Sequence, residues 1–128
     1  MNVGMYLAVA AGGAIGAMLR YAVAQVTAVG MFGIAGPMAT LAVNIAGSAI
    51  MGLVAGLAAS GFILPEAWRG FLAVGLLGAL TTFSSFALDA GALFQKQGLA
   101  MACIYVGLSV CLSLASFALC FWLVRMPS

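Results

Sequence analysis

The sequence predicts an all-α integral membrane protein with four transmembrane helices, and two observations carry that prediction. Of its 128 residues, 66% are hydrophobic and 5% are charged, whereas about a quarter of the residues in a soluble domain are charged. Residues 21–65 and 97–124 contain no charge at all, and each stretch exceeds the roughly 20 apolar residues that a helix needs to cross a bilayer. We therefore expect residues 1–128 to form one four-span domain with no water-soluble part.

Glycine and proline separate the first two spans. The first is expected over about residues 4–27, and it precedes a loop formed by the glycines and proline of residues 30–37, since such clusters interrupt helices. The second is expected over about residues 38–60 and ends at Gly61. Pro65 then suits the entry to the next helix.

Polar residues separate the last two spans. The third is expected over about residues 68–94, because Trp68 is an aromatic residue of the kind enriched at membrane interfaces. A polar turn follows at residues 95–98. The fourth span is expected over about residues 99–124 and stops at Arg125.

The basic residues are balanced across the predicted topology. Four spans place both termini on one side, so Arg69 and Arg125 lie on that side, and Arg20 and Lys96 lie nearer the other. Orientation is normally set by an excess of Lys and Arg on the cytoplasmic side, and a balanced chain can insert both ways. We expect dual topology and an antiparallel homodimer, which would create an inverted repeat from two identical chains. A single, weakly biased orientation is the alternative.

The composition excludes large classes of function. With no histidine and two acidic residues, the chain has no general acid/base pair and no zinc-like ligand set, so it is not expected to be an enzyme. A net charge of +2 without a basic cluster gives no footprint for nucleic acid. The cysteines at 103, 111 and 120 match no redox or metal motif, and we expect them to be buried apolar residues.

One segment of the third span, GLLGALTTFSSF at residues 75–86, is unlike a regular helix. Two glycines precede four hydroxyl residues, and these residue types weaken a helix or compete for its backbone hydrogen bonds. The residues alone leave open a break at mid-membrane and a continuous helix whose hydroxyls bond back to its own backbone. A break there must be buried or line a wet cavity, and its free carbonyls would be ligands for a cation.

Aromatic and polar side chains around this segment suggest an anion path. Phe83 and Phe86 share one helical face; such pairs usually only pack, but an aromatic ring is electropositive at its edge and can solvate an anion without binding it tightly. Polar side chains also recur in the neighbouring spans, and they are equally consistent with pore lining and with hydrogen bonds between helices. They are Thr40 and Asn44 in the second span, and Tyr105, Ser109, Ser113 and Ser116 in the fourth.

Two charged residues within the spans have open roles. Arg20 either extends its side chain to the membrane interface or raises the anion concentration in a vestibule. Asp89, about one turn beyond Phe86, either pairs with a basic residue or stays protonated. Charges inside membrane spans are functional candidates by default.

Three segments resemble the Fluc (CrcB-type) family of small dual-topology fluoride channels. They are GGAIGAMLRY (residues 12–21), TLAVNIAG (40–47) and GLLGALTTFSSF (75–86), of which the last is the most specific. The resemblance extends over essentially the whole chain. It implies an antiparallel homodimer in the bacterial inner membrane, with two fluoride pores and a structural sodium ion on the dimer axis.

The resemblance also implies a role for individual residues. Three positions depart from the pattern of the family: Ala79, Ser85 and Asp89 stand where glycine, threonine and glutamate are usual. The implied roles are backbone carbonyl ligands of sodium for Gly78 and Thr81, pore phenylalanines for Phe83 and Phe86, an amide donor for Asn44, a polar track for Tyr105, Ser109 and Ser113, pore companions for Thr40 and Ser84, and an anion vestibule for Arg20.

The expected function is therefore passive, fluoride-selective export that protects the cytoplasm. In a cell that is negative inside, the membrane potential drives an anion outward with roughly 2.3 kcal/mol per charge for each 100 mV. A small multidrug exporter would need an acidic residue in the first span, which has none. A fluoride/proton antiporter would have to use Asp89. A purely structural subunit would tolerate apolar replacements along the hydroxyl stripe of the fourth span, which consists of Tyr105, Ser109, Ser113 and Ser116.

Overall fold

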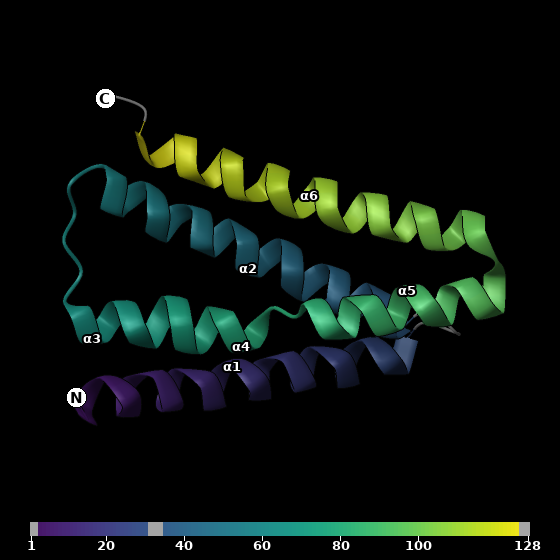
Figure 1. The fold of residues 1–128 in the computed structure, drawn as a ribbon, viewed down its shortest axis with the longest axis horizontal. Helices are drawn as coiled ribbons and strands as arrows, with labels where there is room; N and C mark the ends of the chain where they lie inside the picture. Colours follow the sequence, from purple (N-terminus) through teal and green to yellow (C-terminus); the bar gives the residue numbers. More distant parts are fainter. Residues whose placement is uncertain (1–2, 31–34, 126–128) are drawn as a thin grey trace.

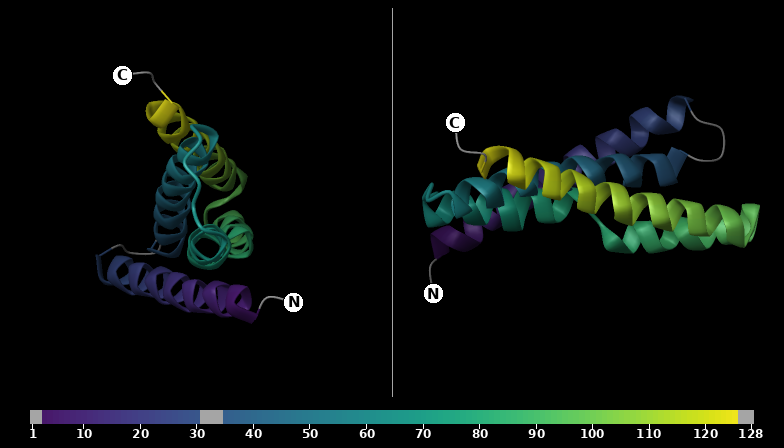
Figure 2. Two further views of the ribbon diagram at one scale, coloured as in Figure 1. Left: turned by 90° about the vertical axis from the view of Figure 1, so that its left-hand side faces the viewer. Right: turned by 90° about the horizontal axis from the view of Figure 1, so that it is seen from above.

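The computed structural model describes residues 3–30 and 35–125, which form four long helical segments arranged side by side (Figure 1). The third segment is composite and includes one π-helix, η1. Helix α1 begins and α6 ends at the same end of the molecule, and α1 is inclined to the other helices (Figure 2). The elements are α1 (Val3–Gly30), α2 (Ala35–Ala59), α3 (Glu66–Arg69), η1 (Gly70–Leu77), α4 (Gly78–Leu80), α5 (Phe83–Gln97) and α6 (Leu99–Arg125).

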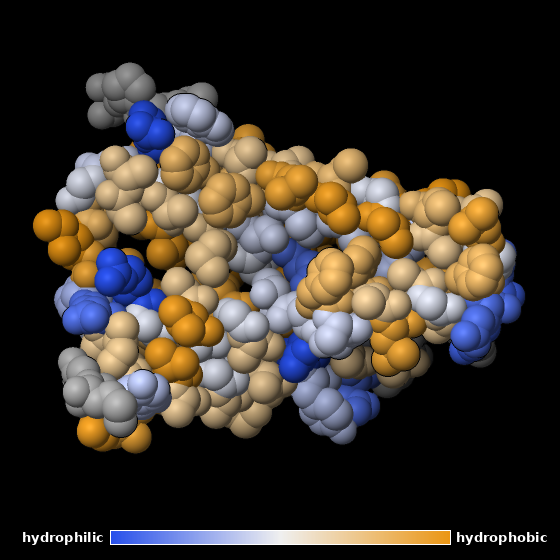
Figure 3. All heavy atoms as spheres, viewed as in Figure 1, coloured by the Kyte–Doolittle hydropathy of each residue, from blue (hydrophilic) through white to orange (hydrophobic). Residues whose placement is uncertain are grey.

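Four segments of the described chain are long and apolar enough to cross a membrane, which confirms the predicted all-α class. They are Val3–Ala28, Gly36–Ala59, Glu66–Gln97 and Leu99–Arg125. Many large apolar side chains point outward, and the face in Figure 3 is largely hydrophobic. Such a surface suits lipid rather than water, and the protein is a multi-pass membrane protein.

The prediction of the first loop was partly wrong. Gly30 is the last residue of α1, and Gly36 and Pro37 lie in the first turn of α2. Proline is tolerated there because the first N–H groups of a helix have no partner within the helix. Gly33 lies outside the described residues.

The later boundaries also show one difference from the prediction. Residues 95–97, predicted as part of a turn, are helical, and α5 ends where Gly98 adopts a φ of 89°. Glycine reaches this left-handed region without a steric penalty. Pro65 precedes α3 directly, in agreement with its predicted place at a helix entry.

Glycines allow the helix backbones to approach closely. A Cβ atom at Gly12 or Gly16 of α1 would overlap the carbonyl groups of Phe71 or Leu76 in η1. Gly52 and Gly56 of α2 lie in the same way against the backbone of α6 at Phe117 and Phe121. Lipid supplies no hydrophobic force between helices, so close packing of this kind carries much of their association.

We expect Gly16→Ala to lower the free energy of unfolding by about 1–3 kcal/mol, the usual cost of overpacking. Its new methyl group would meet the Leu76 carbonyl, whereas a methyl group at Gly13 has nothing within 4 Å. Gly13→Ala is thus the matched control, and it should be neutral or gain up to about 1 kcal/mol of helix propensity. Thermal unfolding in detergent measures both variants, and equal stabilities would contradict the contact.

Two small buried clusters flank the segment between α4 and α5. One contains Val43, Leu77 and Leu80, and the other contains Leu93, Ala102 and Tyr105. They hold α4 against α2 on one side and α5 against α6 on the other, which fixes the two half-helices separately.

The cysteine prediction was wrong for two residues: Cys103 and Cys111 are exposed on the chain, and Cys120 is half-buried.

Candidate functional site

The third segment is interrupted at Thr81 and Thr82, the position at which the sequence left a break and a continuous helix open. The φ and ψ angles are −80° and 153° at Thr81 and −154° and 125° at Thr82, so both residues are extended. The N–H and the hydroxyl group of Thr81 both donate to the Leu77 carbonyl, at 3.0 and 2.8 Å. A hydroxyl bonded back to the helix thus coexists with an interruption of that helix.

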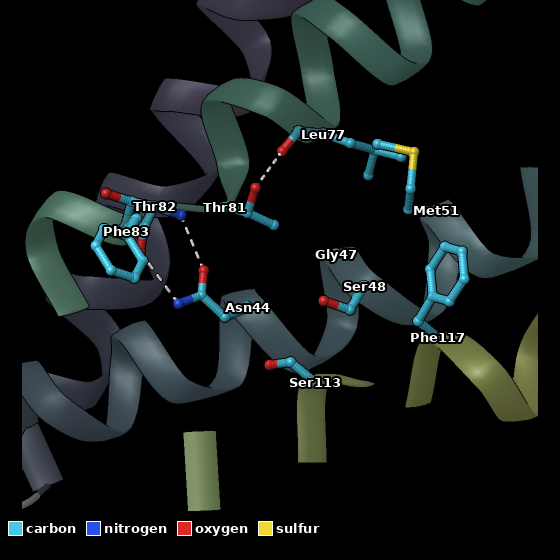
Figure 4. A pocket seen from close by; sticks show the side chains of 10 residues that line it. All are labelled: Asn44, Gly47, Ser48, Met51, Leu77, Thr81, Thr82, Phe83, Ser113 and Phe117. Carbon is cyan, nitrogen blue, oxygen red and sulfur yellow. Dashed lines mark hydrogen bonds between the residues drawn. The ribbon is translucent and has the colours of Figure 1, made fainter. Parts of the chain in front are cut away.

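Asn44 of α2 bonds to the backbone of the interruption in both directions (Figure 4). The N–H of Thr82 donates to Asn44 Oδ1 at 2.8 Å, and Asn44 Nδ2 donates to the Thr82 carbonyl at 3.2 Å. Backbone polar groups away from water need partners. A single carboxamide therefore satisfies both polar groups of this peptide residue.

Thr82 also caps the helix that follows. Its Oγ1 accepts from the N–H of Ser85 at 3.2 Å, which is the usual bond of an N-cap residue. The Thr82 hydroxyl further lies 3.2 Å from the hydroxyl of Ser84, whose side chain is exposed. Threonine at this position thus starts α5 and stabilises the interruption from its far side.

These bonds leave two carbonyls without their helical donors. In a continuous α-helix each N–H donates to the carbonyl four residues earlier, so Thr82 would donate to Gly78, and Ser85 to Thr81. Both N–H groups donate to side-chain oxygens instead. The C-terminal end of a half-helix is also the negative end of its dipole. The carbonyls of Gly78 and Thr81 therefore fit a hard cation such as sodium.

The two predicted pore phenylalanines lie together, and Tyr105 continues the row. The ring centroids of Phe83 and Phe86 are 5.3 Å apart, and those of Phe86 and Tyr105 are 5.6 Å apart. Phe86 is half-buried, whereas 79% of the Phe83 surface is exposed on the single chain. In a membrane, the exposed part of the Phe83 side chain must therefore be covered by lipid or by another chain.

Five of the predicted site residues line an open cavity of about 200 Å³. The hydroxyls of Ser109 and Ser113 are buried, and neither has a hydrogen-bond partner within the described chain. Buried hydroxyls without partners are costly, so these two suit an occupant that accepts hydrogen bonds. The predicted site residues that line the cavity are Asn44, Phe83, Phe86, Ser109 and Ser113.

A second open cavity of about 300 Å³ adjoins the first, because Asn44, Phe83 and Ser113 line both (Figure 4). It reaches Thr81 and Thr82 at the interruption. By contrast, Ser116 lies outside both cavities and donates to the Ile45 carbonyl of α2 at 3.1 Å. The hydroxyl stripe of α6 therefore has two parts, one facing the cavities and one bonding to a neighbouring helix.

Thr40, Asp89 and Tyr105 form a separate hydrogen-bonded group. The hydroxyl of Thr40 donates to Asp89 Oδ2 at 2.6 Å, and the hydroxyl of Tyr105 donates to the same oxygen at 3.5 Å. Within residues 3–30 and 35–125, Asp89 thus bonds to hydroxyl groups and pairs with no basic side chain. Arg20 and Thr40 line a further open cavity of about 340 Å³ together with Ser85.

Comparison with known proteins places the chain in a family. Residues 7–121 match the family model described as CrcB-like protein, Camphor Resistance (CrcB). The chain belongs to the CrcB-like family. The resemblance seen in the sequence is thereby confirmed.

Curated members of the CrcB-like family are similar to the chain over most of its length. The "Fluoride-specific ion channel FluC" of Aeromonas salmonicida (strain A449) is 46% identical over 110 residues, which cover 86% of this chain and 87% of the relative. The protein of the same name from Shewanella amazonensis is 47% identical over 108 residues, or 84% and 86% of the two chains. "Fluoride-specific ion channel FluC 2" of Nitrobacter hamburgensis is 38% identical over 120 residues, or 94% and 96%.

In this CrcB-like chain, the roles of Thr82 as the cap of α5 and as the partner of Asn44 were not predicted from the sequence. The available signal was a threonine three residues before Ser85 at the start of a helix, which is typical of an N-cap. The pairing of its backbone with Asn44 had no signal, because the two residues belong to different spans and no spacing rule relates them.

Proposed function

We propose that the protein is a fluoride-selective ion channel through which F⁻ leaves the bacterial cytoplasm passively. The observation that carries the proposal is the cavity in which two unpartnered buried hydroxyls, Ser109 and Ser113, face the side chains of Asn44, Phe83 and Phe86. The names of the curated relatives support a channel rather than an enzyme, and fluoride as the ion.

The cavity lining suits a small anion because it offers hydrogen-bond donors and electropositive ring edges but no negative charge. Hydroxyl and amide groups donate hydrogen bonds, and the edges of phenyl rings are electropositive. Asp89 is held outside this lining by Thr40 and Tyr105. Weak donors replace the hydration shell without trapping the ion, which is the compromise that conduction requires.

The functional unit in this proposal is an antiparallel homodimer with dual topology in the bacterial inner membrane. A second chain would cover the exposed Phe83 and complete the wall of the open cavities. The balance of Arg20 and Lys96 against Arg69 and Arg125 supports insertion in both orientations. Arg20, beside Thr40 and Ser85, would raise the anion concentration at the entrance.

Sodium is proposed as the structural ion of the dimer, held by the carbonyls of Gly78 and Thr81. Two chains would contribute four such oxygens on the dimer axis. Among residues 3–30 and 35–125, no group of three or more His, Cys, Asp or Glu side chains gathers, so backbone carbonyls are the suitable donors there. When bound, the ion supplies a positive charge that joins the two interrupted helices.

Fluoride efflux from proteoliposomes tests the proposal. With potassium inside, an ion-selective electrode should record rapid release of F⁻ only after a potassium ionophore is added, because an uncoupled anion must move with a compensating charge. Chloride-loaded vesicles should release little. Efflux without the ionophore, accompanied by proton movement, would support an antiporter instead, and the absence of efflux would refute the channel.

A further inference from the structure

We infer that Asn44 is a positioning residue that holds the interruption of the third segment open, and that it thereby couples the anion cavities to the carbonyls of Gly78 and Thr81. The carboxamide takes the place of the helical partners that Thr82 lacks. The inference rests on the proposed function for its consequences for transport, sodium binding and dimer formation, whereas the clamp itself is a matter of hydrogen bonding.

The geometry of the clamp matches that of a peptide group. Oδ1 accepts from the Thr82 N–H at 2.8 Å, and Nδ2 donates to the Thr82 carbonyl at 3.2 Å. An amide presents the same donor and acceptor as a backbone unit, so Asn44 pairs with Thr82 much as a neighbouring strand would. A carboxylate has no donor, an apolar side chain has neither group, and a hydroxyl carries its donor and acceptor on a single oxygen, whereas the carboxamide places them on two atoms.

Removing the clamp would favour a regular helix. Without Asn44 as a fixed acceptor, the Thr82 N–H would be shared between an open state without a partner and a helical bond to the Gly78 carbonyl four residues earlier. The open state exchanges with solvent, and the helical state occupies that carbonyl. Gly78 would then lose the free carbonyl oxygen proposed to face sodium. The side chain on α2 therefore controls whether this carbonyl is available, although it does not itself bind the cation.

The surroundings hold α2 at the distance that the clamp requires. Gly47, one turn after Asn44, is buried, and a Cβ atom there would overlap the methyl group of Thr81. Val43, beside Asn44, is 3% exposed and packs on Leu77 and Leu80 of the preceding half-helix. These contacts fix the carboxamide against the interruption.

The same side chain has a further donor for the cavities. Nδ2 carries two hydrogens and uses one for the Thr82 carbonyl. Asn44 also lines both cavities described above, so the second hydrogen is available to an occupant. The donor at the anion path and the shape of the interruption are therefore set by one residue.

Amide hydrogen exchange of the full-length protein in detergent tests the clamp. We expect Asn44→Ala to speed exchange at Thr82 about fivefold or more, the effect of roughly 1 kcal/mol, because it removes a hydrogen bond and frees the local structure to open. Ser113→Ala is the matched control, since Ser113 lines the same two cavities and makes no side-chain bond to the interruption. Its Thr82 amide should exchange at the wild-type rate.

Asn44→Asp separates the two halves of the clamp and serves if the alanine variant fails to fold. A carboxylate still accepts from the Thr82 N–H but cannot donate to its carbonyl, so Thr82 should stay protected more than in Asn44→Ala. Unchanged exchange at Thr82 in both Asn44 variants would overturn the inference.

The sodium dependence of dimer formation is the second readout. We expect Asn44→Ala to raise the sodium concentration that gives half-maximal dimer at least about tenfold, the effect of roughly 1.4 kcal/mol, and Ser113→Ala to leave it unchanged. Loss of fluoride efflux in Asn44→Ala with wild-type sodium dependence would identify Asn44 as a pore donor only and overturn the coupling. If the wild type conducts no fluoride, the proposed function fails, while the exchange rates still judge the clamp.

Discussion

Phe86→Ile is expected to slow fluoride efflux about a hundredfold, which corresponds to the loss of about 3 kcal/mol of interaction with the passing ion. Isoleucine is apolar and bulky, but it has no electropositive ring edge. Phe86 lies between Phe83 and Tyr105 and lines the cavity with the two unpartnered hydroxyls. Electrode-recorded efflux from proteoliposomes measures the change. The same loss is expected for Phe83→Ile.

Phe71→Ile is the matched control for the phenylalanine variants. The Phe71 ring lies in η1 against Trp68, at 5.9 Å between centroids, and lines a different pocket. Its replacement should leave efflux within about twofold of wild type, a difference of less than 0.5 kcal/mol. All three variants should elute at the wild-type volume in size-exclusion chromatography. Normal efflux in Phe86→Ile would show that the ring edge does not carry the ion.

Removal of sodium is expected to have the second large effect, namely dissociation of the proposed dimer with at least a tenfold loss of efflux. Without the ion, the carbonyls of Gly78 and Thr81 from the two chains would face each other at the negative ends of two half-helices. A tenfold change corresponds to about 1.4 kcal/mol. Covalent crosslinking after dialysis into an organic-cation buffer measures the dimer fraction.

Restoring sodium to the dialysed protein is the control for irreversible damage. Both the dimer and the efflux should return, whereas adding the same concentration of an organic cation should restore neither. A dimer that persists with full efflux through exhaustive removal of sodium would contradict the axial ion. The proposed fluoride path would survive that result, because its donors lie on different atoms.

The fold class was predictable because it depends on composition. Stretches without charge are too apolar for water, and their lengths match the bilayer. The boundaries of the helices were less predictable. Gly36 and Pro37 were expected in a loop but lie in the first turn of α2, where a proline removes no helical hydrogen bond. Glycines four residues apart are typical of close helix packing, but only the structure placed Gly12 and Gly16 of α1 against η1, and Gly52 and Gly56 of α2 against α6.

The candidate site was predictable as a list of residues and less so as an arrangement. The spacing of Ser109, Ser113 and Ser116 suggested one stripe, yet Ser116 bonds to the Ile45 carbonyl while the other two face a cavity. Thr40 was expected as a companion of the pore; in the structure its hydroxyl donates to Asp89, and the residue also lines the cavity beside Arg20. Helical periodicity defines which residues share a face, but not which neighbour that face meets.

By itself, the sequence determined that this protein is helical, lies in a membrane and belongs to the CrcB-like family, because hydropathy and local motifs are properties of contiguous residues. Only the tertiary structure decided that Asn44 of α2 pairs with Thr82, and that the carbonyls of Gly78 and Thr81 lack helical donors. Those bonds join residues far apart in the chain. Their formation depends on how closely α2 packs against the interrupted segment, which Gly47 permits and no local pattern encodes.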